Sequence, residues 1–244
     1  MSGEVVALWT AKGGTGKTTV ATNLAALLGK RGRVLLVDLD AQASSSVAVG
    51  VAPADGLLKA LLGEAPLADL IEPTFDWLDV VPGGPELANA ERVLASEPGA
   101  ETLLRAALKG VQYSAVVLDC PPGVSTLSIG ALAAATVHIA PIAPDPLSVA
   151  GLSQTLKVAD NVRSRLNSKL PPSRVLLSRV PRTRAARLTS EGLRERLGAR
   201  VLATEIPERA VVVESIALRI PVVHHAPQSP VALAFEALAE EVFP

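Results

Sequence analysis

The chain has 244 residues, of which 49% are hydrophobic and only 2% aromatic, so a core would be built from Leu, Val, Ile and Ala. This composition excludes a disordered chain, and the single cysteine, Cys120, excludes an internal disulfide and fits a reducing compartment. The net charge of −1 excludes a uniformly basic or acidic protein, yet residues 157–200 carry 12 Lys and Arg against three acidic residues, a net +9.

Short apolar runs alternate with longer helical patterns along the chain. The runs that predict strands are 4–9, 33–40, 78–82, 114–119, 137–142, 174–178 and 199–203. The patterns that predict helices are 17–31, 56–71, 85–96, 99–109, 124–135, 147–167, 184–197 and 230–242. Nearly continuous apolar runs are typical of strands covered on both faces. The alternation therefore predicts an α/β fold with a doubly wound, mostly parallel sheet, flanked by helices on both faces, in a single domain over 1–244.

A glycine-rich segment, KGGTGKTT, connects the first predicted strand to the first predicted helix. It matches the phosphate-loop pattern G-x-x-x-x-G-K-[ST], with Ala11 at the position where glycine is usual. Glycines let the backbone wrap a phosphate, and the amides of residues 14–17 would point inward at a helix N-terminus. Lys17 would reach the β- and γ-phosphates, and the Thr18 hydroxyl would bind Mg²⁺. The segment thus predicts a P-loop NTPase.

The extra lysine, Lys12, makes this segment resemble the deviant Walker motif K-G-G-x-G-K-[ST]-[ST] of the ParA/MinD superfamily. The resemblance implies that Lys12 crosses a dimer interface and reaches the phosphates of ATP held by the other subunit. It implies a nucleotide site formed by the motif together with the proline of IPERAVVVES, a segment that resembles the closing pattern of the family. These residues are Lys12, Gly13, Gly14, Thr15, Gly16, Lys17, Thr18, Thr19 and Pro207.

Two further predicted strands end in acidic residues. VLLVDLDAQ ends in Asp38 and Asp40, and VVLDCPP ends in Asp119. Because ligands of open parallel sheets bind at the carboxyl ends of the strands, we expect these carboxylates beside the phosphate loop. Asp119 would hold Mg²⁺ through a water molecule, and Asp38 would support the magnesium shell. By resemblance to the family, Asp40 orients the attacking water, which makes Lys12, Lys17 and Asp40 the candidate catalytic residues.

The basic segment contains SRVPRTRAARLT, with Arg179, Arg182, Arg184 and Arg187. Such a cluster can bind phosphate backbones by counterion release, and the lack of aromatic residues favours duplex over single-stranded DNA. In Soj-like partition ATPases, which the chain resembles over essentially its whole length, a DNA-contacting arginine falls at Arg182. A second falls near Val211 and is absent here, and Arg209 is a candidate substitute. The alternative is a solvated helix face.

The resemblance implies a partition ATPase that forms an ATP-dependent homodimer, binds double-stranded DNA nonspecifically and is stimulated by a ParB-like protein. We expect it in the cytoplasm, associated with the nucleoid and not with a membrane, because the final segment ALAFEALAEEVFP has an acidic polar face. A single Cys120 does not fit an iron protein with a shared cluster. A positioner of a protein cargo remains an alternative, and so does a metabolic P-loop enzyme such as an amidoligase.

Overall fold

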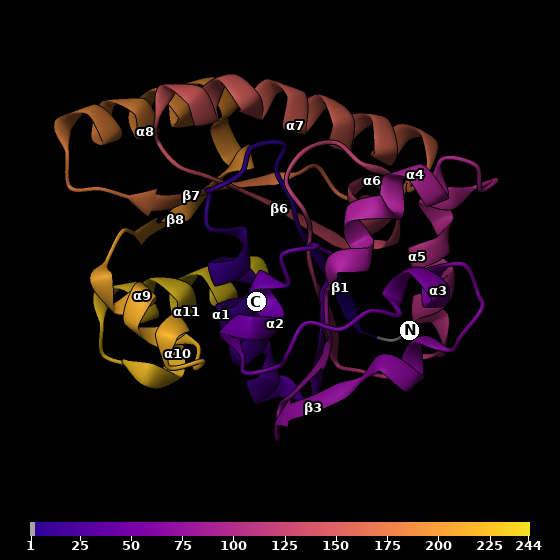
Figure 1. Ribbon diagram of the computed structural model, residues 1–244. Helices are drawn as coiled ribbons and strands as arrows, with labels where there is room; N and C mark the ends of the chain where they lie inside the picture. The colour runs from indigo at the N-terminus through magenta and orange to yellow at the C-terminus, as the bar shows by residue number, and fades with distance from the viewer. Residues whose placement is uncertain (1–2) are drawn as a thin grey trace.

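An eight-stranded sheet forms the middle of the molecule in the computed structural model, which describes residues 3–244 (Figure 1). The strand order is β3-β4-β2-β5-β1-β6-β7-β8. All neighbouring pairs are parallel except β3 and β4, which are antiparallel. The strands are β1 (Glu4–Leu8), β2 (Val34–Asp38), β3 (Glu72–Phe75), β4 (Leu78–Val81), β5 (Ala115–Asp119), β6 (Val137–Ile142), β7 (Arg174–Val180) and β8 (Val201–Pro207).

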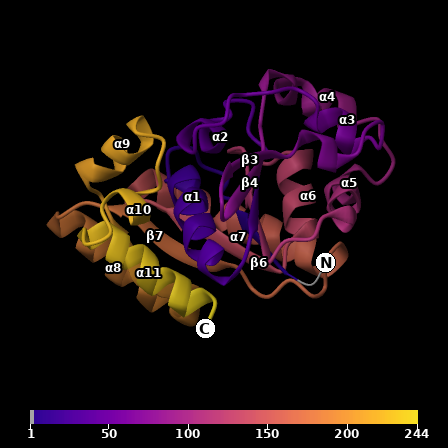
Figure 2. The ribbon, with the colours of Figure 1, turned by 90° about the horizontal axis from the view of Figure 1, so that it is seen from below.

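Helices cover both faces of this sheet, as Figure 2 shows from below. The α-helices are α1 (Lys17–Leu28), α2 (Ser44–Ala48), α3 (Leu57–Leu61), α4 (Ala90–Leu94), α5 (Leu103–Ala107), α6 (Thr126–Ala134), α7 (Pro146–Arg165), α8 (Arg184–Leu197), α9 (Ala210–Ala217), α10 (Val222–His225) and α11 (Pro230–Val242). The short 3-10 helices are η1 (Gly29–Arg31), η2 (Leu67–Leu70), η3 (Pro85–Asn89), η4 (Ala100–Thr102), η5 (Leu108–Gly110) and η6 (Gly198–Arg200). No helix within the described residues is long and apolar enough to cross a membrane.

The alternation of side chains along each strand divides the core into two layers. In β1, Val5 and Ala7 pack on the side of α3 to α7, whereas Val6 and Leu8 pack on the side of α1 and α11. Both sets are almost completely buried, which explains why these strands are continuously apolar in sequence. The predicted doubly wound sheet is confirmed.

A third, smaller apolar cluster joins α7 to α8. It contains Leu152 of α7 and Leu193 of α8, packed over Val175, Leu177 and Val201 of β7 and β8. The two helices lie together along one side of the sheet (Figure 1). Helix α8 therefore packs against α7 and against the last two strands of the sheet.

Several parts of the chain differ from the expected elements. Helices α2 and α10 were not expected, and the predicted helices at 85–96 and 99–109 are each divided into shorter helices. The predicted helix at 56–71 is interrupted at Gly63, which has φ 76°, so it becomes α3 and η2. The edge strand β3 was not expected, because EPTF carries no apolar run. Helix α9 was not expected either, because AVVVESIA is rich in β-branched residues, which disfavour helices.

The topology brings the strand ends that carry the candidate site to one edge. Strand β5 lies between β1 and β2, and Asp119 is in register with both Leu8 and Asp38. The chain leaves β1 for the phosphate loop and leaves β2 for the Asp40 segment. All three segments therefore meet at the carboxyl end of the central strands, where open α/β sheets bind ligands.

Candidate nucleotide site and arginine face

The phosphate loop takes a backbone path that requires glycine. Gly14 and Gly16 have φ 74° and 87°, in the left-handed region that disfavours other residues. At Gly16 a Cβ atom would also lie 2.8 Å from Ser178 Oγ at the end of β7. Gly16 is the N-cap of α1, so the free amides at the start of that helix point into the loop. The loop is shaped to hold an anion.

Lys17 and Thr18 open α1 and face β5. The Thr18 hydroxyl donates a hydrogen bond of 2.7 Å to Asp119 Oδ2. Lys17 is buried, and burial lowers the pKa of its ammonium, although the charges of Asp119 and Asp40 oppose this shift. The neighbouring carboxylates do not fully offset the cost of burying the Lys17 charge. Such a cation favours binding of an anion, and a nucleotide phosphate is one.

Asp119 is the most perturbed carboxyl of the site. Burial, followed by the nearby charge of Asp38, raises its pKa to about 7. Its Oδ1 atom and the hydroxyl of Thr15 are buried without a hydrogen-bond partner among residues 3–244. These two buried oxygens, one in the loop and one at the end of β5, fit a site for a cation and a phosphate.

The metal ligands that the chain itself offers are few. Within the described residues, no three His, Cys, Asp or Glu side chains gather as a metal site. The Thr18 hydroxyl and Asp119 carboxylate fit Mg²⁺, which keeps several waters and shares phosphate oxygens rather than filling its shell with protein ligands. The predicted metal positions Thr18 and Asp119 are thus brought together.

Asp38 and Asp40 follow β2 but have different surroundings. Asp38 is fully buried, and its carboxylate accepts hydrogen bonds from Asp40 N (3.1 Å), Ser46 N (2.9 Å) and Ser46 Oγ (2.7 Å). Burial nevertheless raises its pKa. In this arrangement Asp38 fixes the segment that carries Asp40, and its place in the magnesium shell stays a prediction.

Asp40 is only half-buried and has a freer carboxylate. Its Oδ1 accepts a bond of 2.9 Å from Gln42 N. Its negative charge acts on Lys17. Its role as the residue that orients the attacking water stays a prediction.

The segment after Asp119 is tied to the end of β1. The indole Nε1 of Trp9 donates to Gly123 O at 2.9 Å, and Gly123 N donates to Ala11 O at 3.0 Å. Cys120 is buried, and burial raises the pKa of its thiol well above the usual value. It is a packed core cysteine and not a reactive one.

Lys12 has different partners from Lys17. Its Nζ binds Asp145 Oδ1 at 3.1 Å and Ser148 Oγ at 3.0 Å, both at the start of α7. Within one chain the Lys12 ammonium is therefore bound to α7. Sequence analysis did not identify Asp145 and Ser148, since DPLS reads only as a helix start.

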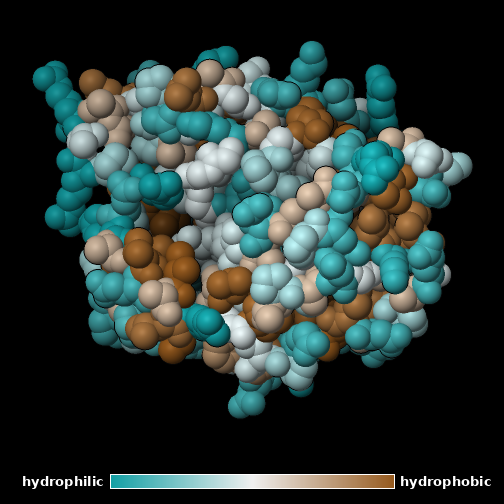
Figure 3. Space-filling model, in the orientation of Figure 1, coloured by the Kyte–Doolittle hydropathy of each residue, from teal (hydrophilic) through white to brown (hydrophobic). Residues whose placement is uncertain are grey.

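A cavity of about 330 Å³ adjoins the phosphate loop on the side of β7 and β8. It is lined by Gly14, Gly16, Thr19, Ser178, Arg179, Ile206, Pro207, Glu208, Arg209, Val212, Val213 and Ile216. In Figure 3 an apolar patch over α9, at the lower left, borders this hollow. The predicted nucleotide residue Pro207 lines this cavity together with apolar side chains of α9, and its contact with a nucleotide stays a prediction.

Arg179 belongs to this cavity and not to the basic cluster in which we placed it. Its backbone has φ 53°, and its guanidinium binds Gly14 O at 2.8 Å and Glu208 Oε1 at 2.9 Å. This conformation turns the side chain back toward the phosphate loop. We therefore remove Arg179 from the candidate DNA-binding residues and assign it to the nucleotide cavity.

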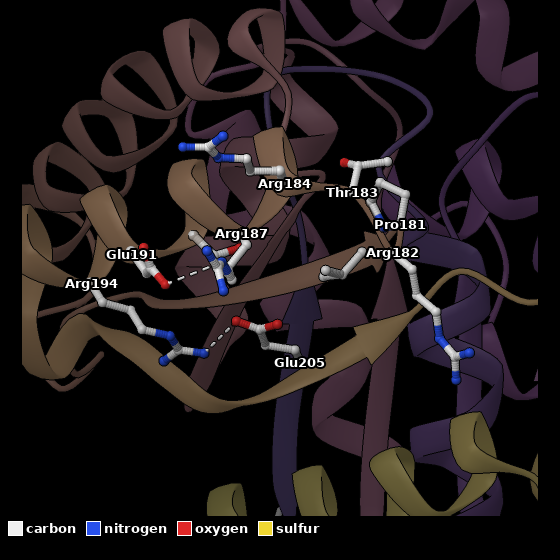
Figure 4. Close-up of a pocket in the computed structure, with 10 residues that line it drawn as sticks. Pro181, Arg182, Thr183, Arg184, Arg187, Glu191, Arg194 and Glu205 are labelled. Atoms are coloured by element: carbon white, nitrogen blue, oxygen red, sulfur yellow. Dashed lines mark hydrogen bonds and ion pairs between the residues drawn. The ribbon is translucent and has the colours of Figure 1, made fainter.

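The other three arginines lie where β7 leads into α8, and Figure 4 shows that the Arg182 side chain points away from those of Arg184 and Arg187. Arg182, Arg184 and Arg187 are exposed and line a second cavity of about 610 Å³ (Figure 4). The Thr183 hydroxyl caps α8 by accepting a bond of 3.2 Å from Ala186 N. This bond fixes the start of the helix, which lies between Arg182 and Arg184. Arg187 lies 3.7 Å from Glu191, and this pair is largely exposed. We call Arg182, Arg184 and Arg187 the arginine face.

Comparisons with known proteins agree with this geometry. A family model described as an AAA domain matches residues 3–171. The chromosome-partitioning ATPase Soj of Thermus thermophilus is 39% identical over 239 residues, which cover 97% of this chain and 94% of that protein.

Three solved structures share the fold. Apo McdA of Cyanothece superposes with a TM-score of 0.88 at 21% identity, covering 98% of this chain and 99% of that one. Cobyrinic acid a,c-diamide synthase of Mycobacterium smegmatis with bound ADP and magnesium gives 0.82 at 29% identity, covering 97% and 92%. The septum site-determining protein MinD of Pyrococcus horikoshii with Mg-ADP gives 0.78 at 29% identity, covering 98% and 96%.

The similarity extends over nearly the whole chain, which carries the phosphate loop and the two acidic strand ends described above. The chain therefore belongs to the ParA/MinD family of P-loop ATPases.

Proposed function

We propose that this protein is a partition ATPase that dimerises with ATP, binds double-stranded DNA without sequence preference and releases it after hydrolysis. The cofactors are ATP and Mg²⁺. One observation supports the ATPase activity in particular. Thr18 Oγ1 lies 2.7 Å from Asp119 Oδ2, and Thr18 follows a loop in which Gly14 and Gly16 have positive φ. The relation to a chromosome-partitioning ATPase over 97% of the chain supports the partition role.

Each residue of the nucleotide site has a separate task. The amides at the start of α1 and the ammonium of Lys17 hold the phosphates. The Thr18 hydroxyl and the Asp119 carboxylate would hold Mg²⁺, which would neutralise charge on the phosphates. Asp40 orients the attacking water, and in this role positioning of the water outweighs proton abstraction. Hydrolysis is therefore slow until an activating protein, by resemblance a ParB-like one, completes the site.

The arginine face would contact the DNA backbone. Its three guanidinium groups are exposed and come from the turn before α8 and the first turn of that helix. No aromatic side chain lies among the residues that line this cavity, which favours backbone contacts over base stacking. A dimer would present two such faces, and this doubling links ATP binding to DNA affinity. Such a protein would be cytoplasmic and associated with the nucleoid.

A binding measurement tests this proposal. Two duplexes of unrelated sequence are titrated with protein in ADP, ATP and a non-hydrolysable ATP analogue, at several salt concentrations. We expect tight binding to both duplexes only with ATP or the analogue. The variant Arg182→Glu/Arg184→Glu should bind weakly and should lower the salt slope by about 0.9 for each lost phosphate contact.

The matched control is Arg92→Glu, a charge reversal at an exposed arginine of α4, far along the chain from the arginine face. It should bind like the wild type. Equal loss of binding in both variants would mean that net charge, and not the arginine face, governs binding.

Absence of DNA binding in every nucleotide state would refute the partition role and favour the second candidate, a metabolic P-loop enzyme. The likeness to a protein named cobyrinic acid a,c-diamide synthase keeps that candidate open. A positioner of a protein cargo would bind DNA in the same assay and would differ only in its activating partner.

A further inference from the structure

Lys12 is held inside its own subunit by the start of α7. Its ammonium binds Asp145 Oδ1 at 3.1 Å and Ser148 Oγ at 3.0 Å. The side chains of Lys12 and Asp145 are 34% and 41% exposed, so water reaches the pair and it can open. The proposed function requires this same ammonium to reach a phosphate in another subunit.

Asp145 is a rigid anchor for this contact. It is the N-cap of α7 and accepts bonds from Leu147 N and Ser148 N, each at 3.0 Å, and from Ser148 Oγ at 2.5 Å. Partial burial works against its ionisation, but the bonds from Ser148 and Lys12 prevail and lower its pKa to about 2. The carboxylate is therefore charged and fixed wherever the protein is assayed.

The backbone beside Lys12 is also fixed on α7. Ala11 N donates to Thr155 Oγ1 at 3.0 Å, and Gly151 approaches to 3.7 Å of Lys12 Cβ, measured to where its own Cβ would be. These contacts hold the backbone of Ala11 and the Cβ atom of Lys12, but they do not hold the ammonium. Lys12 can therefore leave Asp145 by rotating its side chain, without moving the phosphate loop.

From this geometry we propose that Asp145 retains Lys12 within the free subunit and so opposes formation of the ATP-dependent dimer. The inference rests on the proposed function, because it assigns a competitor to the lysine that would bridge two subunits. In the free chain the ammonium is partly neutralised by Asp145. In the dimer it must break this contact before it binds a phosphate of the other chain, and a phosphate is the stronger partner.

The size of the effect follows from the exposure of the pair. Solvent-exposed ion pairs change an equilibrium by about 1.4- to 5-fold. Two such contacts break when one symmetric dimer forms. Loss of both should therefore lower the dimer dissociation constant by about 2- to 30-fold.

The variant Asp145→Asn tests the proposal, because asparagine is as good an N-cap as aspartate but carries no charge. The dissociation constant of the dimer is measured by sedimentation in Mg²⁺ and a non-hydrolysable ATP analogue. We expect tighter dimerisation than in the wild type, and a smaller effect in the same direction for Ser148→Ala. The double variant Lys12→Ala/Asp145→Asn should not dimerise, because the released lysine is gone.

Asp160→Asn is the matched control, since Asp160 lies on the same helix and forms exposed ion pairs with Arg163 and Arg200. It should dimerise like the wild type, and thermal melting should show that all variants fold. Equal or weaker dimerisation of Asp145→Asn would overturn the proposal, and weaker dimerisation would make Asp145 a contact of the dimer itself.

The wild-type protein tests the proposed function separately. If it stays monomeric with the analogue at every concentration, the sandwich dimer fails. Asp145→Asn still decides the further inference in that case. Dimerisation of the variant alone would support retention by Asp145, and a monomeric variant would refute it.

Discussion

Replacement of Asp119 by asparagine should stabilise the nucleotide-free protein while it destroys the magnesium site. Asp119 is 1% exposed, its Oδ1 has no hydrogen-bond partner among the described residues, and the charge of Asp38 lies nearby. Burial and this charge favour the protonated form of the carboxyl. Asparagine resembles that neutral form in size and keeps an oxygen for the Thr18 hydroxyl.

The magnitude follows from the pKa of Asp119, about 7 in the folded chain against an ordinary value of 3.8. Between these two values the folded state binds more protons than the unfolded state, so the free energy of unfolding falls as the pH rises. Above pH 7 the ionised carboxylate disfavours folding by up to about 4 kcal/mol. Below pH 4 the carboxyl is neutral in both states, and this contribution disappears.

The assay is urea unfolding of the wild type and Asp119→Asn at pH 8 and pH 5, without nucleotide or Mg²⁺. We expect the variant to be more stable at pH 8 and the difference to shrink at pH 5, with no change in the slope of free energy against urea. The variant should also lose the stabilisation that Mg-ATP gives the wild type. A variant that is less stable than the wild type at pH 8 would refute the electrostatic reasoning.

Three further substitutions test other parts of the nucleotide site. Lys12→Ala should leave ATP affinity within about 3-fold of the wild type and abolish ATP-dependent dimerisation; fluorescent-nucleotide titration and sedimentation measure these, and a variant that still dimerises would exclude a bridging lysine. Asp40→Ala should keep ATP binding but slow hydrolysis by about 100-fold or more, so that the dimer accumulates in ATP; phosphate release at the wild-type rate would remove Asp40 from the mechanism. Gly16→Ala should lower ATP affinity by at least about 10-fold, because the residue has φ 87° and its Cβ would lie 2.8 Å from Ser178 Oγ; unaltered affinity would show that the loop tolerates a side chain there.

The sequence predicted the strands that are buried on both faces, because an uninterrupted apolar run is sufficient to identify them. It did not predict β3, whose residues EPTF sit at the exposed sheet edge and carry no such run. Helix α9 was hidden because its three consecutive valines favour strands, and packing against the rest of the fold overrides that preference. Local composition is a weaker guide wherever tertiary contacts decide.

Among the site residues, those set by strand ends were predictable and those set by side-chain direction were not. Thr18 and Asp119 meet because neighbouring parallel strands end at one edge. Arg179 was grouped with Arg182 because they are close in sequence, but its positive φ sends it to Gly14. The contact between Lys12 and Asp145 joins residues 133 positions apart, and no sequence pattern marks it.

Helix α7 touches the phosphate loop at Ala11 and Lys12 and packs through Leu152 against Leu193 of α8, which carries part of the arginine face. This helix of 20 residues thus contacts the phosphate loop at one point and, at another, the helix that carries Arg184 and Arg187. With the proposed function, a rearrangement of Lys12 that displaces α7 would change the free energy of DNA binding, and linkage would make the relation reciprocal. DNA would then alter the affinity of the protein for ATP by the same factor by which ATP alters its affinity for DNA. The chromosome would act as an effector of the nucleotide cycle as well as a surface to which the protein binds.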